Sequence, residues 1–218
     1  MSQDQPTVAA GGDAETQPSP WNLPNALTVM RILLVPVFVW LILRHGGDDT
    51  ASRWWAWGVF AFAIITDRID GDLARARNLV TDFGKVADPI ADKALTGAGF
   101  ISLSMIGEIP WWITVVILVR EIGITVMRFW VIRHGVMPAS RGGKLKTFLQ
   151  ALAIGMFVWP LTTFPVEILF RGAAWVILVA ALVVTVATAV DYVLKALTLR
   201  KTSDRAREKR ERKAAGGR

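Results

Sequence analysis

The sequence contains no cysteine, which excludes disulfide bonds and metal sites built from thiolates. Its two histidines, His45 and His134, lie far from the main group of acidic residues and are interpreted as loop residues. Basic residues are absent from residues 1–20, so this stretch does not resemble a secretory signal peptide. Because it is polar, contains proline and lacks an apolar run, it is predicted to be a disordered N-terminal tail.

Hydrophobic residues make up 53% of the 218 residues, a composition typical of an integral membrane protein. The apolar runs predict an all-α fold with six transmembrane helices in one domain, residues 21–198. A basic tail, residues 199–218, follows. The predicted spans are residues 26–43, 54–66, 94–106, 111–130, 148–166 and 172–190.

Six of the eighteen acidic residues fall within residues 67–93, between two apolar segments. Asp67 and Asp70 are spaced i,i+3, and Asp88 and Asp92 are spaced i,i+4, so each pair shares one face of a helix. Pro89 predicts that the second of these helices begins or bends close to Asp88. A short polar link would let the two acidic pairs face each other at the membrane–water interface.

Four carboxylates in such a site would repel one another. Two unit charges about 4 Å apart cost roughly 4 kcal/mol at an effective dielectric constant near 20. Oxygen ligands without nearby histidine or cysteine favour a hard divalent cation, Mg²⁺ or Mn²⁺. Two such ions would offset the four charges and form a site suited to displacement at phosphorus.

The spacing of this stretch is D-x2-D-G-x2-A-R-x8-G-x3-D-x3-D. The pattern resembles the signature of the CDP-alcohol phosphatidyltransferases, membrane enzymes that build phospholipid headgroups. A solvated loop between two spans is the alternative, but such a loop has no reason to reproduce the full spacing. The positions are filled by Asp67, Asp70, Gly71, Ala74, Arg75, Gly84, Asp88 and Asp92.

The resemblance implies a homodimeric enzyme whose aspartates hold two metal ions: Asp67, Asp70, Asp88 and Asp92. Asp92 would also act as general base on the acceptor hydroxyl. A second set would bind CDP-diacylglycerol; the guanidinium of Arg75 suits phosphate, and Gly71 permits close approach of the nucleotide. That set comprises Asn25, Thr28, Gly71, Ala74, Arg75, Thr81 and Gly84.

The fourth predicted span contains Arg120, Glu121 and Arg128, and ionisable residues within a span are candidates for function. Residues 132–147 are interpreted as a basic, glycine-containing loop. Together they resemble the branch of the family that uses glycerol 3-phosphate, which implies that Arg128, Lys144 and Lys146 bind the acceptor phosphate. Two alternatives remain open: Arg120 and Glu121 could form a structural ion pair, and the basic loop could simply fix the topology.

The distribution of positive charge predicts the topology. Most lysines and arginines lie in the links after spans two and four and in the tail, which places these segments and both termini in the cytosol. From Leu199 onward nine basic residues stand against three acidic ones. We expect this tail to contact anionic headgroups rather than nucleic acid. The protein is thus predicted to be a multi-pass protein of the cytoplasmic membrane.

The reaction implied by the resemblance joins CDP-diacylglycerol and sn-glycerol 3-phosphate into phosphatidylglycerol phosphate, with release of CMP. The acidic motif is expected to contact only the nucleotide and the metals, so it does not identify the acceptor. Inositol phosphate or phosphatidylglycerol remains an alternative acceptor. A divalent-cation transporter is the alternative from another class, but its acids would lie near the bilayer midplane.

Overall fold

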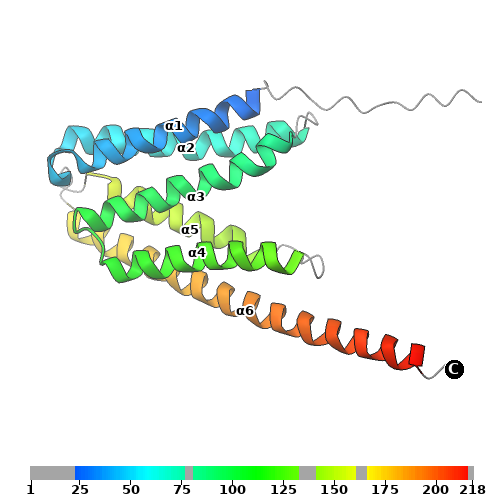
Figure 1. Cartoon of the computed structure of the whole chain (residues 1–218). Helices are drawn as coiled ribbons and strands as arrows, with labels where there is room; N and C mark the ends of the chain where they lie inside the picture. The colour runs from blue at the N-terminus through cyan, green and yellow to red at the C-terminus, as the bar shows by residue number, and fades with distance from the viewer. Residues whose placement is uncertain (1–22, 77–80, 133–140, 161–165, 216–218) are drawn as a thin grey trace, which may run out of the picture.

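The computed structural model describes residues 23–76, 81–132, 141–160 and 166–215, and the predicted disordered tail, residues 1–20, lies outside the described residues. The described residues are helical and contain no β-strand, and successive long helices run antiparallel (Figure 1). The elements are α1 (Leu23–Leu43), the short 3-10 helix η1 (Arg44–Gly47), α2 (Thr50–Ala76), α3 (Asp82–Met105), α4 (Trp111–Ile132), α5 (Arg141–Val158) and α6 (Glu167–Ala215).

One end of the bundle collects the polar parts of the sequence. The start of α1, the end of α2, the start of α3, the end of α4 and the start of α5 all lie at this end (Figure 1). Helix α1 packs against both α2 and α3, and α5 packs against α6. The acidic motif and the basic segment, which are far apart in sequence, are therefore carried to the same end of the molecule.

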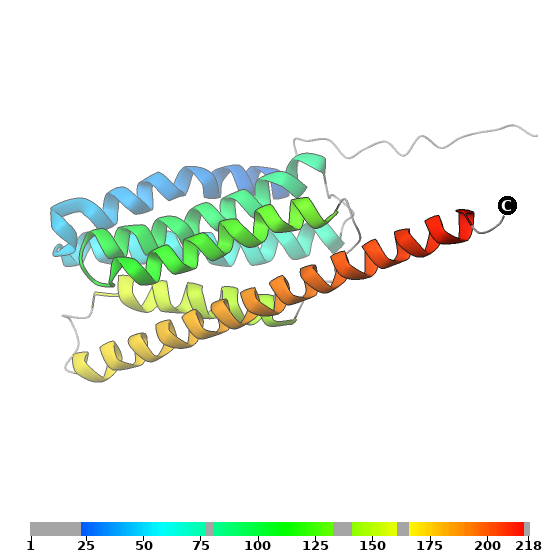
Figure 2. The same ribbon diagram turned by 60° about the horizontal axis from the view of Figure 1, so that its bottom comes forward.

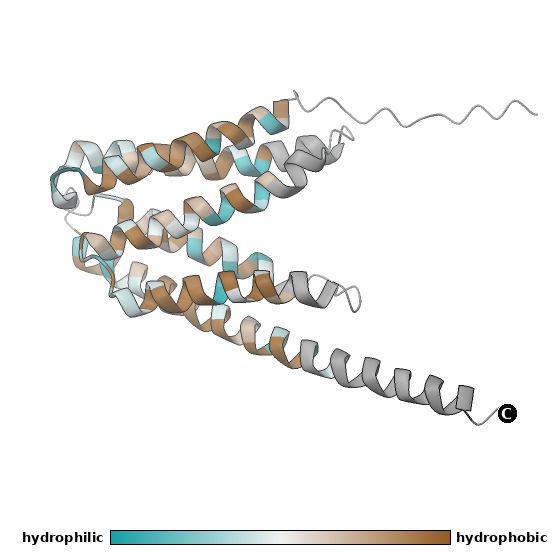
Figure 3. Cartoon of the chain, in the orientation of Figure 1, coloured by the Kyte–Doolittle hydropathy of each residue, from teal (hydrophilic) through white to brown (hydrophobic). Residues whose placement is uncertain are grey.

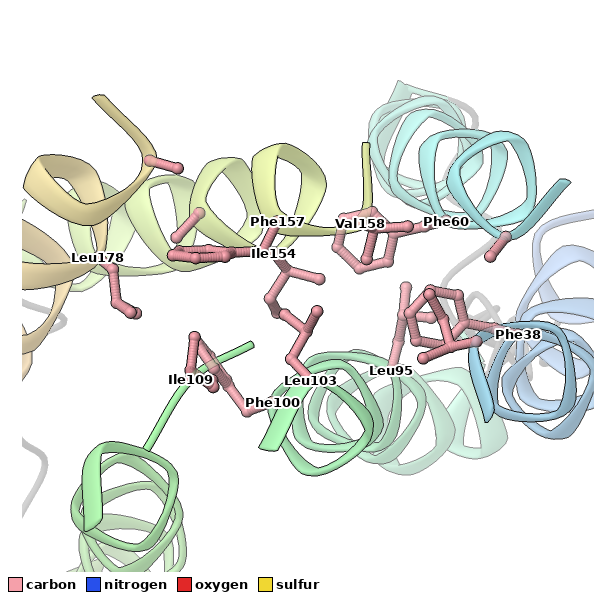
Figure 4. Packing of buried hydrophobic residues seen from close by; sticks show 14 of the residues in the cluster. Phe38, Phe60, Leu95, Phe100, Leu103, Ile109, Ile154, Phe157, Val158 and Leu178 are labelled. Atoms are coloured by element: carbon pink, nitrogen blue, oxygen red, sulfur yellow. The ribbon is translucent and has the colours of Figure 1, made fainter. Parts of the chain in front are cut away.

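The interior of the bundle is a single apolar cluster that fixes the relative positions of these helices. Phe38, Phe60, Leu95 and Phe157 are among its buried members and come from α1, α2, α3 and α5 (Figure 4). At Gly99 a Cβ atom would lie 2.9 Å from side-chain atoms of Ile154. The absence of a side chain there lets α3 and α5 approach closely, as small residues do between helices in lipid.

An ion-pair network closes the opposite end of the bundle. Arg53 of α2 pairs with Glu108 at 2.7 Å and donates hydrogen bonds to the carbonyl oxygens of Phe157 at 2.6 Å and Val158 at 3.4 Å. Arg171 of α6 pairs with the other carboxylate oxygen of Glu108 at 3.2 Å. The network joins α2, the α3–α4 connection, α5 and α6.

Three boundaries differ from those predicted. Helix α3 begins at Asp82, which excludes a helix start close to Asp88, one of the two predicted alternatives, and Pro89 lies inside the helix. Helix α5 begins at Arg141, so residues 141–147 are helical rather than part of a loop. The same helix ends at Val158, ahead of Pro160, instead of continuing around it, because proline disfavours helical geometry in the preceding residue.

Helix α6 is longer than the predicted sixth span. It continues without interruption from Glu167 to Ala215 and extends past the rest of the bundle (Figure 2). The segment from Leu199 to Ala215 is therefore a helical continuation of the domain. Within the part of the chain that the structure describes, two segments are long and apolar enough to cross a membrane, judged by length and composition alone: Asn25–Gly47 and Glu167–Lys195.

Candidate active site

Three polar residues of α1 lie on one face of the helix. Asn25, Thr28 and Arg31 recur at intervals of three residues, which places them one above the other. All three are buried, with exposed fractions of 6%, 1% and 1%. A buried polar stripe in an otherwise apolar helix requires polar partners, because an unsatisfied buried polar group is costly.

The acidic motif and its link supply these partners. Thr28 donates a hydrogen bond from Oγ1 to Oδ1 of Asp88 over 2.5 Å. Arg31 pairs through Nη1 with Oδ1 of Asp67, also at 2.5 Å. Helix α1 therefore contacts one acid of α2, Asp67, and one acid of α3, Asp88.

Asn25 and Thr81 form the third connection. The Asn25 amide donates to Thr81 Oγ1 at 2.8 Å, and Thr81 Oγ1 lies 3.0 Å from Asn25 Oδ1. Thr81 is the residue just before α3, and it is buried. Both residues were assigned to the nucleotide site from the sequence, and both are found at the end of the bundle that holds the acids.

Arg31 is the member of this site whose partner the sequence did not reveal. From its place near the start of the first predicted span, Arg31 is expected to reach the membrane interface or a phosphate. The structure instead buries it against Asp67. The available signal was its position: an arginine inside an apolar run, three residues after Thr28, shares a face with residues already assigned to the site.

Asp92 lies one helical turn beyond Asp88 on α3. Burial raises the pKa of Asp92, and the negative charge of Asp67 raises it further, whereas Lys146 and Arg31 act in the opposite direction. The raised pKa means that the charged form of Asp92 is disfavoured where it stands. Additional positive charge would stabilise that charged form.

The chemistry of these donors fits a hard divalent cation, because such ions prefer carboxylate oxygens and because burial disfavours the negative charge of Asp92. Among the described side chains, however, no three acids or histidines lie close enough together to form a metal site. For Asp70, Gly71, Ala74 and Arg75 in α2, Gly84 in α3 and Arg128 in α4, the structure describes the helix but not the side-chain position. The pair of metal ions thus remains a prediction.

A cavity of about 140 Å³ adjoins Asp92 between α3, α4 and α5. Its lining is mostly apolar and includes Phe100 and Ile117. Several polar residues also line it, and they bring the predicted base and one predicted acceptor ligand to the same space. These polar residues include Asp92, Lys93, Thr96, Glu121, Lys146 and Gln150.

Lys146 is the best-placed of the predicted acceptor ligands. It is 7% exposed and contacts Glu121 through Nζ, and its burial lowers its pKa while Glu121 raises it. Lys144 is exposed and does not line the cavity. Side chains two residues apart on an α-helix point in directions about 200° apart around the helix axis. The structure therefore separates Lys144 and Lys146, which the loop interpretation placed together.

Arg120 and Glu121 form an ion pair, which was one of the two alternatives for these residues of the fourth predicted span. Arg120 Nη1 lies 3.2 Å from Glu121 Oε1. The same guanidinium donates to the Thr185 carbonyl oxygen at 3.2 Å and to Thr188 Oγ1 at 2.7 Å, both on α6. Arg120 therefore attaches Glu121 to α6, and Glu121 in turn contacts Lys146 on α5.

Comparison with known proteins gives a consistent result along the whole bundle. A family model described as CDP-alcohol phosphatidyltransferase matches residues 21–187. The chain is similar to the "Probable phosphatidylglycerophosphate synthase" of Mycobacterium tuberculosis, with 54% identity over 176 residues, 81% of this chain and 82% of the relative.

The names of two further relatives state activities that differ from each other. The CDP-diacylglycerol–glycerol-3-phosphate 3-phosphatidyltransferase of Bacillus subtilis is 35% identical over 194 residues, 84% of this chain and 100% of the relative. The CMP-forming cardiolipin synthase of Streptomyces coelicolor is 34% identical over 162 residues, 73% of this chain and 71% of the relative.

Proposed function

The chain belongs to the CDP-alcohol phosphatidyltransferase family, and on that premise we propose that it transfers a phosphatidyl group from CDP-diacylglycerol to sn-glycerol 3-phosphate. The products are phosphatidylglycerol phosphate and CMP. The observation that carries the proposal is the junction of the acidic motif with the cavity at Asp92, where Lys146 provides a buried cation. The names of the relatives from M. tuberculosis and B. subtilis support the same acceptor.

The carboxylates of the motif would hold two Mg²⁺ or Mn²⁺ ions. When bound, these ions would neutralise the pyrophosphate of CDP-diacylglycerol and the charge that develops on the leaving CMP. The residues proposed to hold them are Asp67, Asp70, Asp88 and Asp92.

Asp92 takes the proton from the attacking hydroxyl of the acceptor. The hydroxyl oxygen forms a bond to the phosphorus that bears diacylglycerol, and the bond from that phosphorus to the CMP oxygen breaks. The proton resides on Asp92 and then passes to water, and CMP departs with the bonding electron pair. The raised pKa of Asp92 suits this role, because a base must hold the proton that it accepts.

Helix α1 holds the donor-side residues in place. Thr28 fixes one oxygen of Asp88, Arg31 fixes one oxygen of Asp67, and Asn25 fixes Thr81. We assign the nucleotide of CDP-diacylglycerol to this end of the bundle, with contacts from Asn25, Thr28, Gly71, Ala74, Arg75, Thr81 and Gly84.

The acceptor enters the cavity beside Asp92. Lys146 pairs with its phosphate, and Arg128 and Lys144 contribute positive charge from the ends of α4 and α5. The cavity of about 140 Å³ matches a small polar molecule, since a cavity of about 150 Å³ holds a benzene molecule. This size favours glycerol phosphate over inositol phosphate or a whole second phospholipid.

The helices are proposed to cross the cytoplasmic membrane six times, with the site and both termini in the cytosol. Hydrophobic residues make up much of the described helices (Figure 3), and large apolar side chains such as Trp40, Val119, Ile122 and Val176 are each more than half exposed. An exposed apolar surface of this kind suits contact with lipid. We also propose a homodimer, on the basis of the family resemblance.

Purified protein in detergent tests the function directly. CMP release would be measured with CDP-diacylglycerol and Mg²⁺, and with glycerol 3-phosphate, inositol 1-phosphate or phosphatidylglycerol as acceptor in separate reactions. We expect turnover with glycerol 3-phosphate. Turnover with only one of the other acceptors would contradict the assignment of the cavity, and no CMP with any acceptor would contradict the function as a whole.

A further inference from the structure

We propose that Glu121 is a specificity-determining residue of the acceptor site, and that its carboxylate accepts a hydrogen bond from the acceptor hydroxyl that does not react. This inference rests on the proposed function, because it concerns the polyol phosphate that enters the cavity beside Asp92. It adds a ligand to the site that the acidic motif does not contain.

The contacts of Glu121 involve only one of its two carboxylate oxygens. Lys146 Nζ and Arg120 Nη1 both contact Oε1, and no described residue donates a hydrogen bond to Oε2. The side chain lines the cavity and is only 17% exposed. Oε2 therefore has the capacity to accept a charge-assisted hydrogen bond from a hydroxyl group that enters the cavity.

Glu121 is also held in place before any ligand arrives. Arg120 secures it to the Thr185 carbonyl and the Thr188 hydroxyl of α6, and Lys146 holds it from α5. Gln150 donates to Thr185 Oγ1 at 3.0 Å, which ties the cavity wall to the same turn of α6. A group fixed in this way binds without further ordering, the condition that favours specificity.

Three groups around the cavity then match three groups of the acceptor. Asp92 faces the reacting hydroxyl, Lys146 faces the phosphate, and Glu121 faces the hydroxyl on the carbon between them. The three residues come from α3, α5 and α4 and share one cavity. An ammonium has three N–H donors, so Lys146 can keep Glu121 and still donate to a phosphate.

The charge of Glu121 also reaches the reacting centre. Asp92 of α3 and Glu121 of α4 line the same cavity. Two carboxylates repel a phosphate from their own side and accept hydroxyl donors instead. The acceptor is thereby oriented with its hydroxyls toward Asp92 and Glu121 and its phosphate toward Lys146.

The test compares glycerol 3-phosphate with 3-hydroxypropyl phosphate, which lacks only the middle hydroxyl. For each acceptor kcat/KM would be measured by CMP release, and the ratio between them is the readout. A hydrogen bond to a charged group predicts that the unmodified protein prefers glycerol 3-phosphate by about 10- to 100-fold. Because the ratio is internal to each preparation, it does not depend on how much of a variant is correctly folded.

In Glu121→Ala the preference is expected to fall to within about threefold, whereas Glu121→Gln, which keeps an oxygen acceptor, should retain part of it. Glu108→Gln is the matched control: it removes a carboxylate that also pairs with two cations, but at the opposite end of the bundle. Its preference should equal that of the unmodified protein.

Three results would overturn the inference: an unmodified protein that uses both acceptors equally well, a preference that survives in Glu121→Ala, or a loss of preference in Glu108→Gln as large as that in Glu121→Ala. The failure of the proposed function is distinct, because it would appear as absent CMP release from the unmodified protein with glycerol 3-phosphate.

Discussion

The hydrogen bond from Thr28 to Asp88 gives the sharpest prediction for the donor side of the site. Thr28→Val keeps the shape of the side chain and removes only the hydroxyl that donates to Asp88 Oδ1 over 2.5 Å. Thr28 is 1% exposed, so no water replaces the hydroxyl from its side. The carboxylate loses the contact that orients it.

The expected effect is small for stability and larger for the metal. A hydrogen bond to a charged group is worth about 1.5–3 kcal/mol, but Asp88 is exposed and can be solvated in part, so we expect a loss of about 1 kcal/mol. Loss of an interaction that orients a metal ligand commonly costs about 10- to 100-fold in metal affinity or activity. The Mg²⁺ concentration for half-maximal CMP release should therefore rise at least ~10-fold in Thr28→Val.

The assay is a Mg²⁺ titration of CMP release at saturating CDP-diacylglycerol and glycerol 3-phosphate, with thermal unfolding measured on the same samples. Thr114→Val is the matched control, since Thr114 is also fully buried and its hydroxyl contacts Ser104 at 2.7 Å, away from the acids. It should lower stability without changing the Mg²⁺ requirement. An unchanged requirement in Thr28→Val, or an equal change in Thr114→Val, would refute the reasoning.

Three further predictions concern the base, the acceptor site and the fold. Asp92→Asn should abolish CMP release while CDP-diacylglycerol still binds, because an amide cannot take the proton of the acceptor hydroxyl. Lys146→Ala should raise the KM for glycerol 3-phosphate by ~10-fold or more, judged from a charged hydrogen bond, and Lys144→Ala should raise it less. Equal effects would contradict the separation of the two lysines. Arg53→Met should destabilise the bundle by about 1–3 kcal/mol, because it removes one of the two cations paired with the partly buried Glu108 and the donor to two backbone carbonyl oxygens. Equilibrium unfolding in detergent would detect the loss, and unchanged stability would refute this prediction.

The acidic motif and the apolar runs predicted much of this protein. The apolar runs located the long helices, and the spacing of Asp67 with Asp70 and of Asp88 with Asp92 predicted that two helices carry the acids. The match of the family model to residues 21–187 confirms the resemblance drawn from that spacing. Local sequence was sufficient to identify the family because all the residues of the acidic motif lie within one continuous segment.

The prediction that residues 141–147 belong to a loop was wrong for a physical reason. Gly142 and Gly143 indicate a loop, because glycine disfavours a helix interior. They occupy the first turn of α5, where backbone N–H groups have no partner within the helix and the cost of glycine is smaller. The helical start separates Lys144 from Lys146, a result that the composition of the segment could not reveal.

The roles of Arg31 and Glu121 depended on tertiary contacts. Arg31 meets Asp67 across α1 and α2, and Glu121 meets Lys146 across α4 and α5. Sequence alone marks each as an ionisable residue in an apolar run. Which cation meets which acid is decided by how the helices pack, and this packing depends on the apolar cluster and on close approaches such as that at Gly99.

The central claim, metal-dependent transfer of a phosphatidyl group to glycerol 3-phosphate, is tested most directly by following both products at once. Radiolabelled glycerol 3-phosphate would be incubated with the purified protein, CDP-diacylglycerol and Mg²⁺, and label in the lipid extract would be compared with CMP released. The account predicts one labelled lipid per CMP, and no product when EDTA removes the metal. CMP release without labelled lipid, or undiminished transfer in EDTA, would contradict it.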